Sequence, residues 1–163
     1  MDKTPKSLRT QIGIFGRTNV GKSTLFNRLV EKPKALISPL SHTTRNVNID
    51  IVRWQGAEFE LVDSGGIETI IPKRKQKAAI KKQGETFEVD IIRQTQRYLK
   101  SADFILFIVD TKDGILPQDK EIASYLQKQY KNTPVMLVAN KVDSRQSEAR
   151  LAEFFSFGMG EPF

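Results

Sequence analysis

Apolar residues fall into two kinds of pattern along the chain, and each kind predicts a different type of strand. Short continuous apolar runs at residues 11–15, 104–109 and 135–139 are typical of central parallel strands, which are covered on both faces of a sheet. Residues 47–54 instead alternate apolar and polar side chains, as expected for a strand with one buried face. A turn at 55–57 and a further strand at 58–63 complete a predicted β-hairpin.

Four other segments predict helices, namely residues 22–30, 91–99, 118–130 and 147–155. In the first of them Leu25, Phe26, Leu29 and Val30 fall on one face. Because helices alternate with strands, the sequence predicts an α/β fold of three layers with a mainly parallel sheet. We expect five strands, with residues 47–54 antiparallel at one edge, and one domain without internal repeats.

Positive charge is concentrated in one short segment. The chain has 163 residues and a formal net charge of +7, and residues 69–84 hold six basic side chains and no acidic one. Such a block favours a polyanionic partner, with a solvated loop as the plain alternative. The absence of cysteine excludes disulfides and cysteine metal sites. The longest apolar run is too short to cross a bilayer, so no membrane partner is expected.

The strongest chemical signal is a glycine-rich segment between the first predicted strand and the first predicted helix. It has the spacing Gly, four residues, Gly-Lys-Ser, in which glycines and a helix N-terminus surround phosphate oxygens. Lys22 is expected to reach the β- and γ-phosphates and the Ser23 hydroxyl to bind Mg²⁺. The predicted phosphate-side residues are Gly16, Asn19, Val20, Gly21, Lys22, Ser23 and Thr24.

Two further signals follow other predicted strands. Asp63 is expected to bind the Mg²⁺ shell, and the Gly66 N–H to donate to the γ-phosphate. Asn140, Lys141 and Asp143 directly follow the strand at 135–139. An aspartate at position 143 can accept hydrogen bonds from the N1–H and 2-amino groups of guanine, which adenine does not offer, so GTP is the predicted ligand. Lys141 is expected to lay its stem over the base.

Three stretches carry a more detailed resemblance to one family: residues 16–29 and 61–67, which include the first two motifs, and residues 157–162. Together they resemble the first GTPase domain of the Der (EngA) family. The resemblance implies a P-loop NTPase fold that binds and hydrolyses GTP. It also implies a role in maturation of the large ribosomal subunit in the bacterial cytoplasm, with the subunit or its RNA as partner and no DNA partner.

The resemblance also implies further site residues. Thr44 is expected to meet Mg²⁺ and the γ-phosphate, with Thr43 as the alternative, and Lys22, Thr44 and Gly66 form the implied catalytic set. The implied Mg²⁺ residues are Ser23, Thr44 and Asp63, and Asn19 matches an asparagine that helps hold K⁺ in some relatives. Ile67 stands where Ras-like enzymes keep a glutamine that orients water, so slow intrinsic hydrolysis is expected.

The family continues past Pro162 into a last strand, a Ser-Ala loop and a final helix. We therefore expect residues 1–163 to be one incomplete GTPase domain that leaves uncovered Phe154, Phe155, Phe157 and Phe163. Scattered arginines usually lie in solvent, and this applies to Arg17, Arg45 and Arg53. Two alternative functions stay open: a module that binds GTP without hydrolysing it, and an RNA-binding protein with a vestigial nucleotide site.

Overall fold

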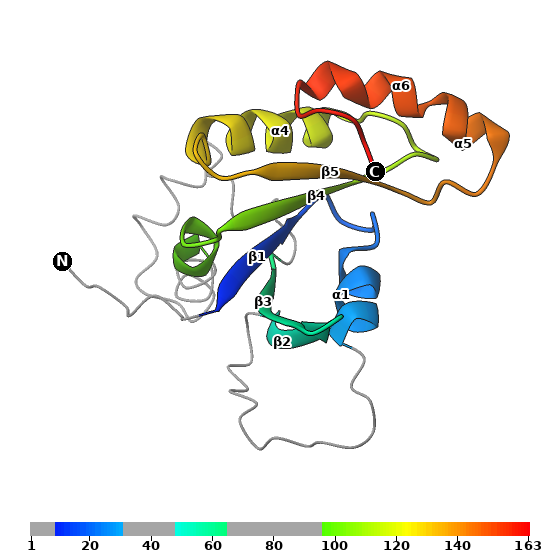
Figure 1. Cartoon of the computed structure of the whole chain (residues 1–163). Helices are drawn as coiled ribbons and strands as arrows, with labels where there is room; N and C mark the ends of the chain where they lie inside the picture. Colours follow the sequence, from blue (N-terminus) through cyan, green and yellow to red (C-terminus); the bar gives the residue numbers. More distant parts are fainter. Residues whose placement is uncertain (1–8, 31–47, 65–95) are drawn as a thin grey trace, which may run out of the picture.

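The structure is a computed structural model that describes residues 9–30, 48–64 and 96–163 (Figure 1). Strands and helices follow one another along these residues. The strands are β1 (Thr10–Phe15), β2 (Asn48–Trp54), β3 (Ala57–Asp63), β4 (Phe104–Asp110) and β5 (Val135–Asn140). The helices are α1 (Lys22–Val30), α4 (Pro117–Gln129), α5 (Arg145–Ala149) and α6 (Leu151–Phe154), followed by the 3-10 turn η2 (Phe155–Phe157). Residues 96–100 are also helical.

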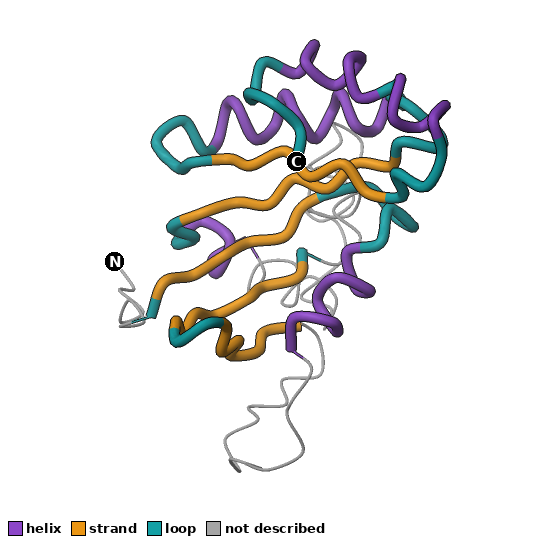
Figure 2. The backbone as a smooth tube through the Cα atoms, turned by 45° about the vertical axis from the view of Figure 1, so that its right-hand side comes forward, coloured by secondary structure: helices purple, strands orange, loops and turns teal. Residues whose placement is uncertain are grey.

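The sheet has the order β2-β3-β1-β4-β5 (Figure 2). β1 pairs in parallel with β3 and β4, β4 pairs in parallel with β5, and β2 pairs antiparallel with β3. The predicted fold class is thus confirmed, including the antiparallel edge strand. After β3 the chain crosses to the other side of β1, and in sheets of this kind ligands bind where the strand order reverses.

The β2–β3 hairpin has a tight turn that follows from its sequence. Trp54 pairs with Ala57, and the two residues between them, Gln55 and Gly56, have φ angles of 47° and 82°. Positive φ at both central positions is what a two-residue type I′ turn requires.

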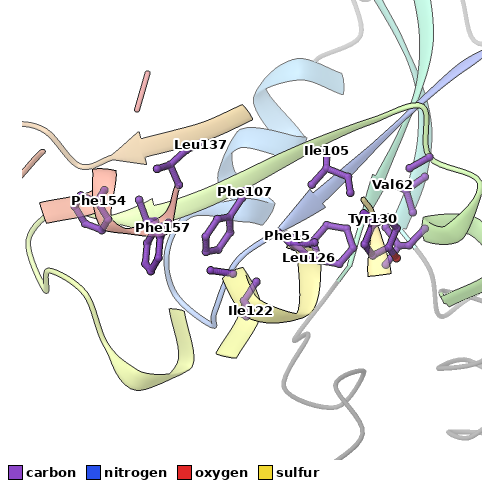
Figure 3. Packing of buried hydrophobic residues seen from close by; sticks show 14 residues of the cluster. Phe15, Val62, Ile105, Phe107, Ile122, Leu126, Tyr130, Leu137, Phe154 and Phe157 are labelled. Atoms are coloured by element: carbon purple, nitrogen blue, oxygen red, sulfur yellow. The ribbon is translucent and has the colours of Figure 1, made fainter. Parts of the chain in front are cut away.

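Apolar side chains alternate between the two faces of the sheet and form two core clusters. Phe107 of β4 belongs to the cluster that packs with α4, whereas its neighbour Ile108 belongs to the cluster that packs with α1. Figure 3 shows Phe107 beside Phe157 of η2, with Ile122 of α4 nearby, and the two phenylalanine ring centroids are 5.6 Å apart. The helices on both faces explain why β4 is apolar along almost its whole length.

Apart from the last helix, and from the segment 91–99 that is described only in part, the predicted element bounds agree with the structure to within one residue. α1 begins at Lys22 and ends at Val30, as predicted. Residues 147–155 were expected to form one helix, but the structure has α5 and α6 with a break at Arg150. α5 begins early because Ser144 caps it: the Ser147 N–H donates to Ser144 Oγ at 3.2 Å, and the Ser144 N–H donates to Ser147 Oγ at 3.0 Å. The helix expected at 91–99 is described only from residue 96.

The C-terminal phenylalanines correct a second expectation. Phe154 is fully buried and Phe157 is 6% exposed, because both rings pack into the α4-side core (Figure 3). Phe155 and Phe163 are exposed, as expected. The Phe163 backbone pairs with β5: its N–H donates to the Leu137 carbonyl at 3.0 Å, and its carbonyl accepts the Ala139 N–H at 2.7 Å. Among the described residues, no helix has the length and apolar character needed to cross a membrane.

Candidate nucleotide-binding site

Four strand ends bring the predicted site residues to one edge of the sheet. Residues 16–21 leave β1, and Asp63, Asp110 and Asn140 are the last residues of β3, β4 and β5. Because these four strands run parallel, their C-terminal ends share one edge, and α1 begins there (Figure 1). The phosphate-side and base-side segments therefore lie at the same end of the domain.

The phosphate loop, residues 16–21, is held by burial and close packing. Val20 is fully buried. Gly21 has a φ of +103°, and a Cβ there would run into the side-chain amide of Asn140. That amide donates to the Val20 carbonyl at 2.7 Å. The loop leads into α1, whose first N–H groups have no partner within the helix, so this corner of the fold offers backbone donors to an anion.

Lys22 is buried against the phosphate loop. It is 6% exposed, and its ammonium group donates to the Arg17 carbonyl at 2.8 Å. A positive charge is thereby fixed beside the helix N-terminus. Asn19, Ser23 and Thr24 are exposed, and Asn19 has a left-handed backbone with φ of 64°. Their side chains are therefore accessible to a ligand.

Ser23 and Asp63 place two oxygen ligands side by side. Asp63 is 2% exposed at the end of β3, and the Ser23 hydroxyl donates to its Oδ2 at 3.2 Å. Mg²⁺ prefers one or two carboxylates together with water and substrate phosphates, so this pair fits the cation. Within the described residues no group of three or more His, Cys, Asp or Glu could hold a metal ion.

The base-side segment, residues 140–143, is tied to the phosphate loop by two side chains. Asn140 donates to the Val20 carbonyl, and Lys141 Nζ donates to the Asn19 carbonyl at 2.8 Å. Lys141 Nζ also donates to Asp110 Oδ2 at 2.5 Å. Lys141 has a φ of 64°, and its N–H donates to Asn140 Oδ1 at 2.9 Å. The two halves of the predicted site are therefore directly connected.

Asp143 has a partner that the sequence did not reveal. Its carboxylate pairs with the Lys112 ammonium group at 2.5 Å, and both side chains are more than half exposed. The hydrogen bond and negative charge of Asp143 raise the pKa of Lys112. A guanine base would have to share this carboxylate with Lys112 or displace it. Lys112 lies in the polar turn after β4, and nothing in its local sequence singles it out.

Two hollows flank residues 140–143. One of about 130 Å³ is lined by residues that include Gly21, Thr24 and Asn140. The other, of about 230 Å³, is lined by residues that include Lys112 and Asp143. Predicted residues of both halves of the site thus border open space.

Arg17 corrects the expectation that the scattered arginines lie in solvent. It is 7% exposed, with Nη2 at 2.7 Å from Asp113 Oδ2 and Nε at 3.3 Å from Asp119 Oδ2. Arg53, in contrast, has a side chain 66% exposed and pairs with Glu58 on the hairpin. An aspartate in the first turn of a helix is a capping signal, and Asp119 Oδ2 does accept the Leu116 N–H at 3.0 Å. That signal does not reveal that an arginine from the phosphate loop will pair with it.

Several predicted positions lie outside the described residues. They are Thr43, Thr44, Arg45, Gly66 and Ile67, together with the basic segment 69–84. The roles assigned to them stay predictions.

The chain is similar to known proteins over most of its length. The profile of a protein family described as "50S ribosome-binding GTPase" matches residues 11–141. GTPase Der of Christiangramia forsetii is 38% identical over 152 residues, which are 93% of this chain and 32% of that protein. GTPase Der of Chlorobaculum tepidum is 35% identical over 156 residues, which are 96% of this chain and 33% of that protein. The chain thus spans about a third of the length of these curated relatives.

Solved structures of the same class share the fold. A variant of Era from Aquifex aeolicus bound to GDP and AlF4⁻ has a TM-score of 0.66 and 28% identity, and the match covers 95% of this chain and 50% of that one. Era in complex with MgGDPNP and a fragment of 16S ribosomal RNA has a TM-score of 0.61 and 27% identity, and the match covers 92% of this chain and 48% of that one. The predicted resemblance to Der proteins is confirmed, and the chain belongs to the family of 50S ribosome-binding GTPases.

Proposed function

We propose that this domain binds GTP with Mg²⁺ and hydrolyses it slowly to GDP and phosphate, acting as a switch. The observation that carries the proposal is the direct connection between the phosphate loop and residues 140–143 through Asn140 and Lys141. A ligand that spans both needs a polyphosphate at one end and hydrogen-bond donors for an aspartate at the other. GTP has this chemistry, and membership of a GTPase family supports the choice.

Each site residue that the structure describes has a role in binding GTP that follows from its environment. The phosphates lie against the backbone N–H groups of the phosphate loop and the N-terminus of α1, and Lys22 balances their charge. Ser23 and Asp63 would hold Mg²⁺, which would supply further positive charge at the phosphate oxygens. Water attacks the γ-phosphorus in line, and the protein chiefly positions groups and stabilises charge.

The residues outside the described part would supply the switch. Thr44 and Gly66 contact the γ-phosphate, as the family resemblance implies, so that GTP orders their loops and hydrolysis releases them. Ile67 has no group that could orient water by a hydrogen bond, and this keeps intrinsic turnover slow.

Base recognition is tested by titrating the domain with GTP, ATP and inosine triphosphate in Mg²⁺ buffer. GTP should bind about 10⁴-fold more tightly than ATP, because adenine leaves the Asp143 carboxylate without its two donors. Inosine triphosphate lacks only the 2-amino group and should fall between them. Asp143→Ala should remove most of the preference. Equal binding of all three nucleotides to the unaltered domain would contradict guanine recognition.

Hydrolysis is tested by phosphate release, with Lys22→Ala as the background. Release above that background supports the GTPase. GTP binding with release no greater than in Lys22→Ala would leave the alternative of a binding module without hydrolysis. RNA binding that does not respond to GTP would favour the vestigial nucleotide site.

A potassium ion beside the phosphates is a finer part of the proposal. Asn19 is exposed in the phosphate loop with a left-handed backbone, which leaves its side chain free to reach a ligand at the loop surface. Turnover should be faster in KCl than in NaCl at equal ionic strength, and Asn19→Ala should remove the difference. The same turnover in both salts would exclude the ion.

We also propose a ribosomal partner, for maturation of the large ribosomal subunit in the cytoplasm. The family description names 50S ribosome binding, which supports the large subunit as partner, and the Era structure contains a fragment of 16S ribosomal RNA, which supports only ribosomal RNA as the kind of ligand. The basic segment 69–84 is the candidate contact, because clustered lysines bind phosphates by releasing counterions. Replacing Lys73, Arg74, Lys75 and Lys77 by glutamate should weaken RNA binding and flatten its salt dependence. Unchanged RNA affinity and salt slope would rule out this contact.

A further inference from the structure

A partly buried ionic cluster adjoins the candidate site, and the proposed mechanism gives it no part. It consists of Arg17 with Asp110, Asp113 and Asp119, which we call the Arg17 cluster. Arg17 Nη2 is 2.7 Å from Asp113 Oδ2 and 3.9 Å from Asp110 Oδ2, and Nε is 3.3 Å from Asp119 Oδ2. One guanidinium thus joins the phosphate loop to the end of β4, to the turn after it and to the first turn of α4.

Two of these carboxylates are deeply buried, and this makes the arginine hard to replace. Asp119 is completely buried, and its Oδ1 atom has no hydrogen-bond partner among the described residues. Burial raises the pKa of Asp119 in spite of the Leu116 hydrogen bond and Arg17. Burial also acts on Asp110, but hydrogen bonds from Lys141 and from the Lys112 backbone outweigh it and lower the pKa of that carboxyl. Loss of Arg17 would take away the cation that lies 3.3 Å from the buried Asp119 carboxylate.

The Arg17 cluster contacts both lysines of the candidate site. On the phosphate side, Lys22 Nζ donates to the carbonyl oxygen of Arg17 itself at 2.8 Å. On the base side, Asp110 Oδ2 is shared between Arg17 and Lys141, whose Nζ lies 2.5 Å away. Lys141 then reaches back to the Asn19 carbonyl at 2.8 Å. A displacement of Arg17 is therefore transmitted to the groups expected at the phosphates and at the base.

We propose that Arg17 is a positioning residue that couples the two ends of the nucleotide site. Its guanidinium forms a long ion pair with Asp110, whose other partner is Lys141 at the base, while its carbonyl orients Lys22 at the phosphates. This inference rests on the proposed GTP-binding function. It assigns to Arg17 no direct contact with the nucleotide.

A double-mutant cycle on GTP affinity tests the coupling. The variants are Arg17→Gln, Lys141→Ala and the two combined, with Arg53→Gln as the matched control, because Arg53 also pairs with a carboxylate but lies on the exposed hairpin. Arg17→Gln should weaken GTP binding about tenfold in the parent chain and less than about threefold in the Lys141→Ala background, because interacting residues are not additive. Arg53→Gln should change nothing.

A merely structural role predicts a different result, in which Arg17→Gln weakens GTP binding by the same factor in both backgrounds. That outcome, or full GTP affinity in Arg17→Gln, overturns the coupling while leaving the proposed function intact. Absence of GTP binding by the unaltered chain overturns both proposals. If Arg17→Gln does not fold, Arg17→Lys enters the same cycle, because lysine keeps the charge but cannot reach several carboxylates at once. It should again lose less affinity in the Lys141→Ala background, and equal losses would again overturn the coupling.

Discussion

Replacement of Gly21 by alanine tests whether the phosphate loop and the base-side segment depend on one close approach. Gly21 has a φ of +103°, and a Cβ there would run into Asn140 Nδ2. That nitrogen donates to the Val20 carbonyl at 2.7 Å, so the added methyl group disturbs both the loop backbone and this hydrogen bond. Gly56 in the β2–β3 turn is the matched control, because its φ is +82° and a Cβ there meets nothing within 4 Å.

The expected losses of stability follow from these two environments. A residue with a Cβ at positive φ loses about 1–2 kcal/mol, and this should be the whole effect of Gly56→Ala. Gly21→Ala carries similar strain and also displaces the Asn140 side chain, whose hydrogen bond contributes about 1 kcal/mol. The free energy of unfolding should therefore fall by about 2–3 kcal/mol for Gly21→Ala. GTP affinity should fall at least about tenfold in Gly21→Ala only, because only there do phosphate-binding N–H groups shift.

Urea denaturation of both variants gives the stabilities, and isothermal titration with GTP gives the affinities. The reasoning is refuted if Gly21→Ala is destabilised no more than Gly56→Ala and binds GTP as tightly as the unaltered chain. Equal destabilisation with a loss of GTP binding in Gly21→Ala alone would assign the effect to the loop backbone and not to the contact with Asn140.

Four further predictions test the site and the core. Asp63→Asn should reduce the gain in GTP affinity on adding Mg²⁺ by at least about tenfold, measured by titration with and without the cation. Lys112→Ala should raise GTP affinity by at most about fivefold, because an exposed ion pair competes weakly, and a fall in affinity would show that Lys112 instead helps to bind nucleotide. In urea denaturation, Phe154→Ala should lower the free energy of unfolding by about 3–5 kcal/mol, whereas the same change at its exposed neighbour Phe155 should lower it by less than about 1 kcal/mol. Equal losses for the two variants would contradict the observed burial. Because the pKa of Asp110 is lowered in the folded chain, its contribution to the free energy of unfolding is fully present above the unfolded pKa of about 4 and is lost as the pH falls through the lower folded pKa. Asp110→Asn should therefore destabilise the chain at pH 7 and progressively less in acid. A difference in stability that does not change with pH would contradict this.

The fold could be predicted where neighbours in the sequence decide a residue's environment. The apolar run at 104–109 had to be a strand covered on both faces, and the structure divides its side chains between two cores. The hairpin was equally local: a turn was expected at 55–57 between two strands, and in the structure Gln55 and Gly56 alone form it. The last helix was less predictable, because its start depends on the reciprocal capping of Ser144 and Ser147 and not on apolar spacing.

The site could be predicted for groups that belong to a motif, but not for the groups that support them. Lys22 and Asp143 could be named as candidates because short spacings define them, and their roles in binding stay predictions. Arg17 was expected in solvent because its partners Asp113 and Asp119 lie 96 and 102 residues further along the chain. Only the folded chain shows that one guanidinium reaches both carboxylates. The partner of Asp143, Lys112, could not be predicted for the same reason, because it comes from a different part of the chain.

The contacts of the phosphate loop explain how a ligand at one end of the site can depend on the other end. The carbonyl groups of Arg17, Asn19 and Val20 each accept a side-chain hydrogen bond, from Lys22, Lys141 and Asn140 respectively. In a planar trans peptide the carbonyl and the following N–H point in opposite directions. Holding these carbonyls toward the protein side chains therefore turns the adjoining N–H groups away from them, where an anion can be bound. Two of these three side chains, Asn140 and Lys141, belong to the base-side segment. A change in that segment must therefore alter the backbone N–H groups that the loop offers to phosphate.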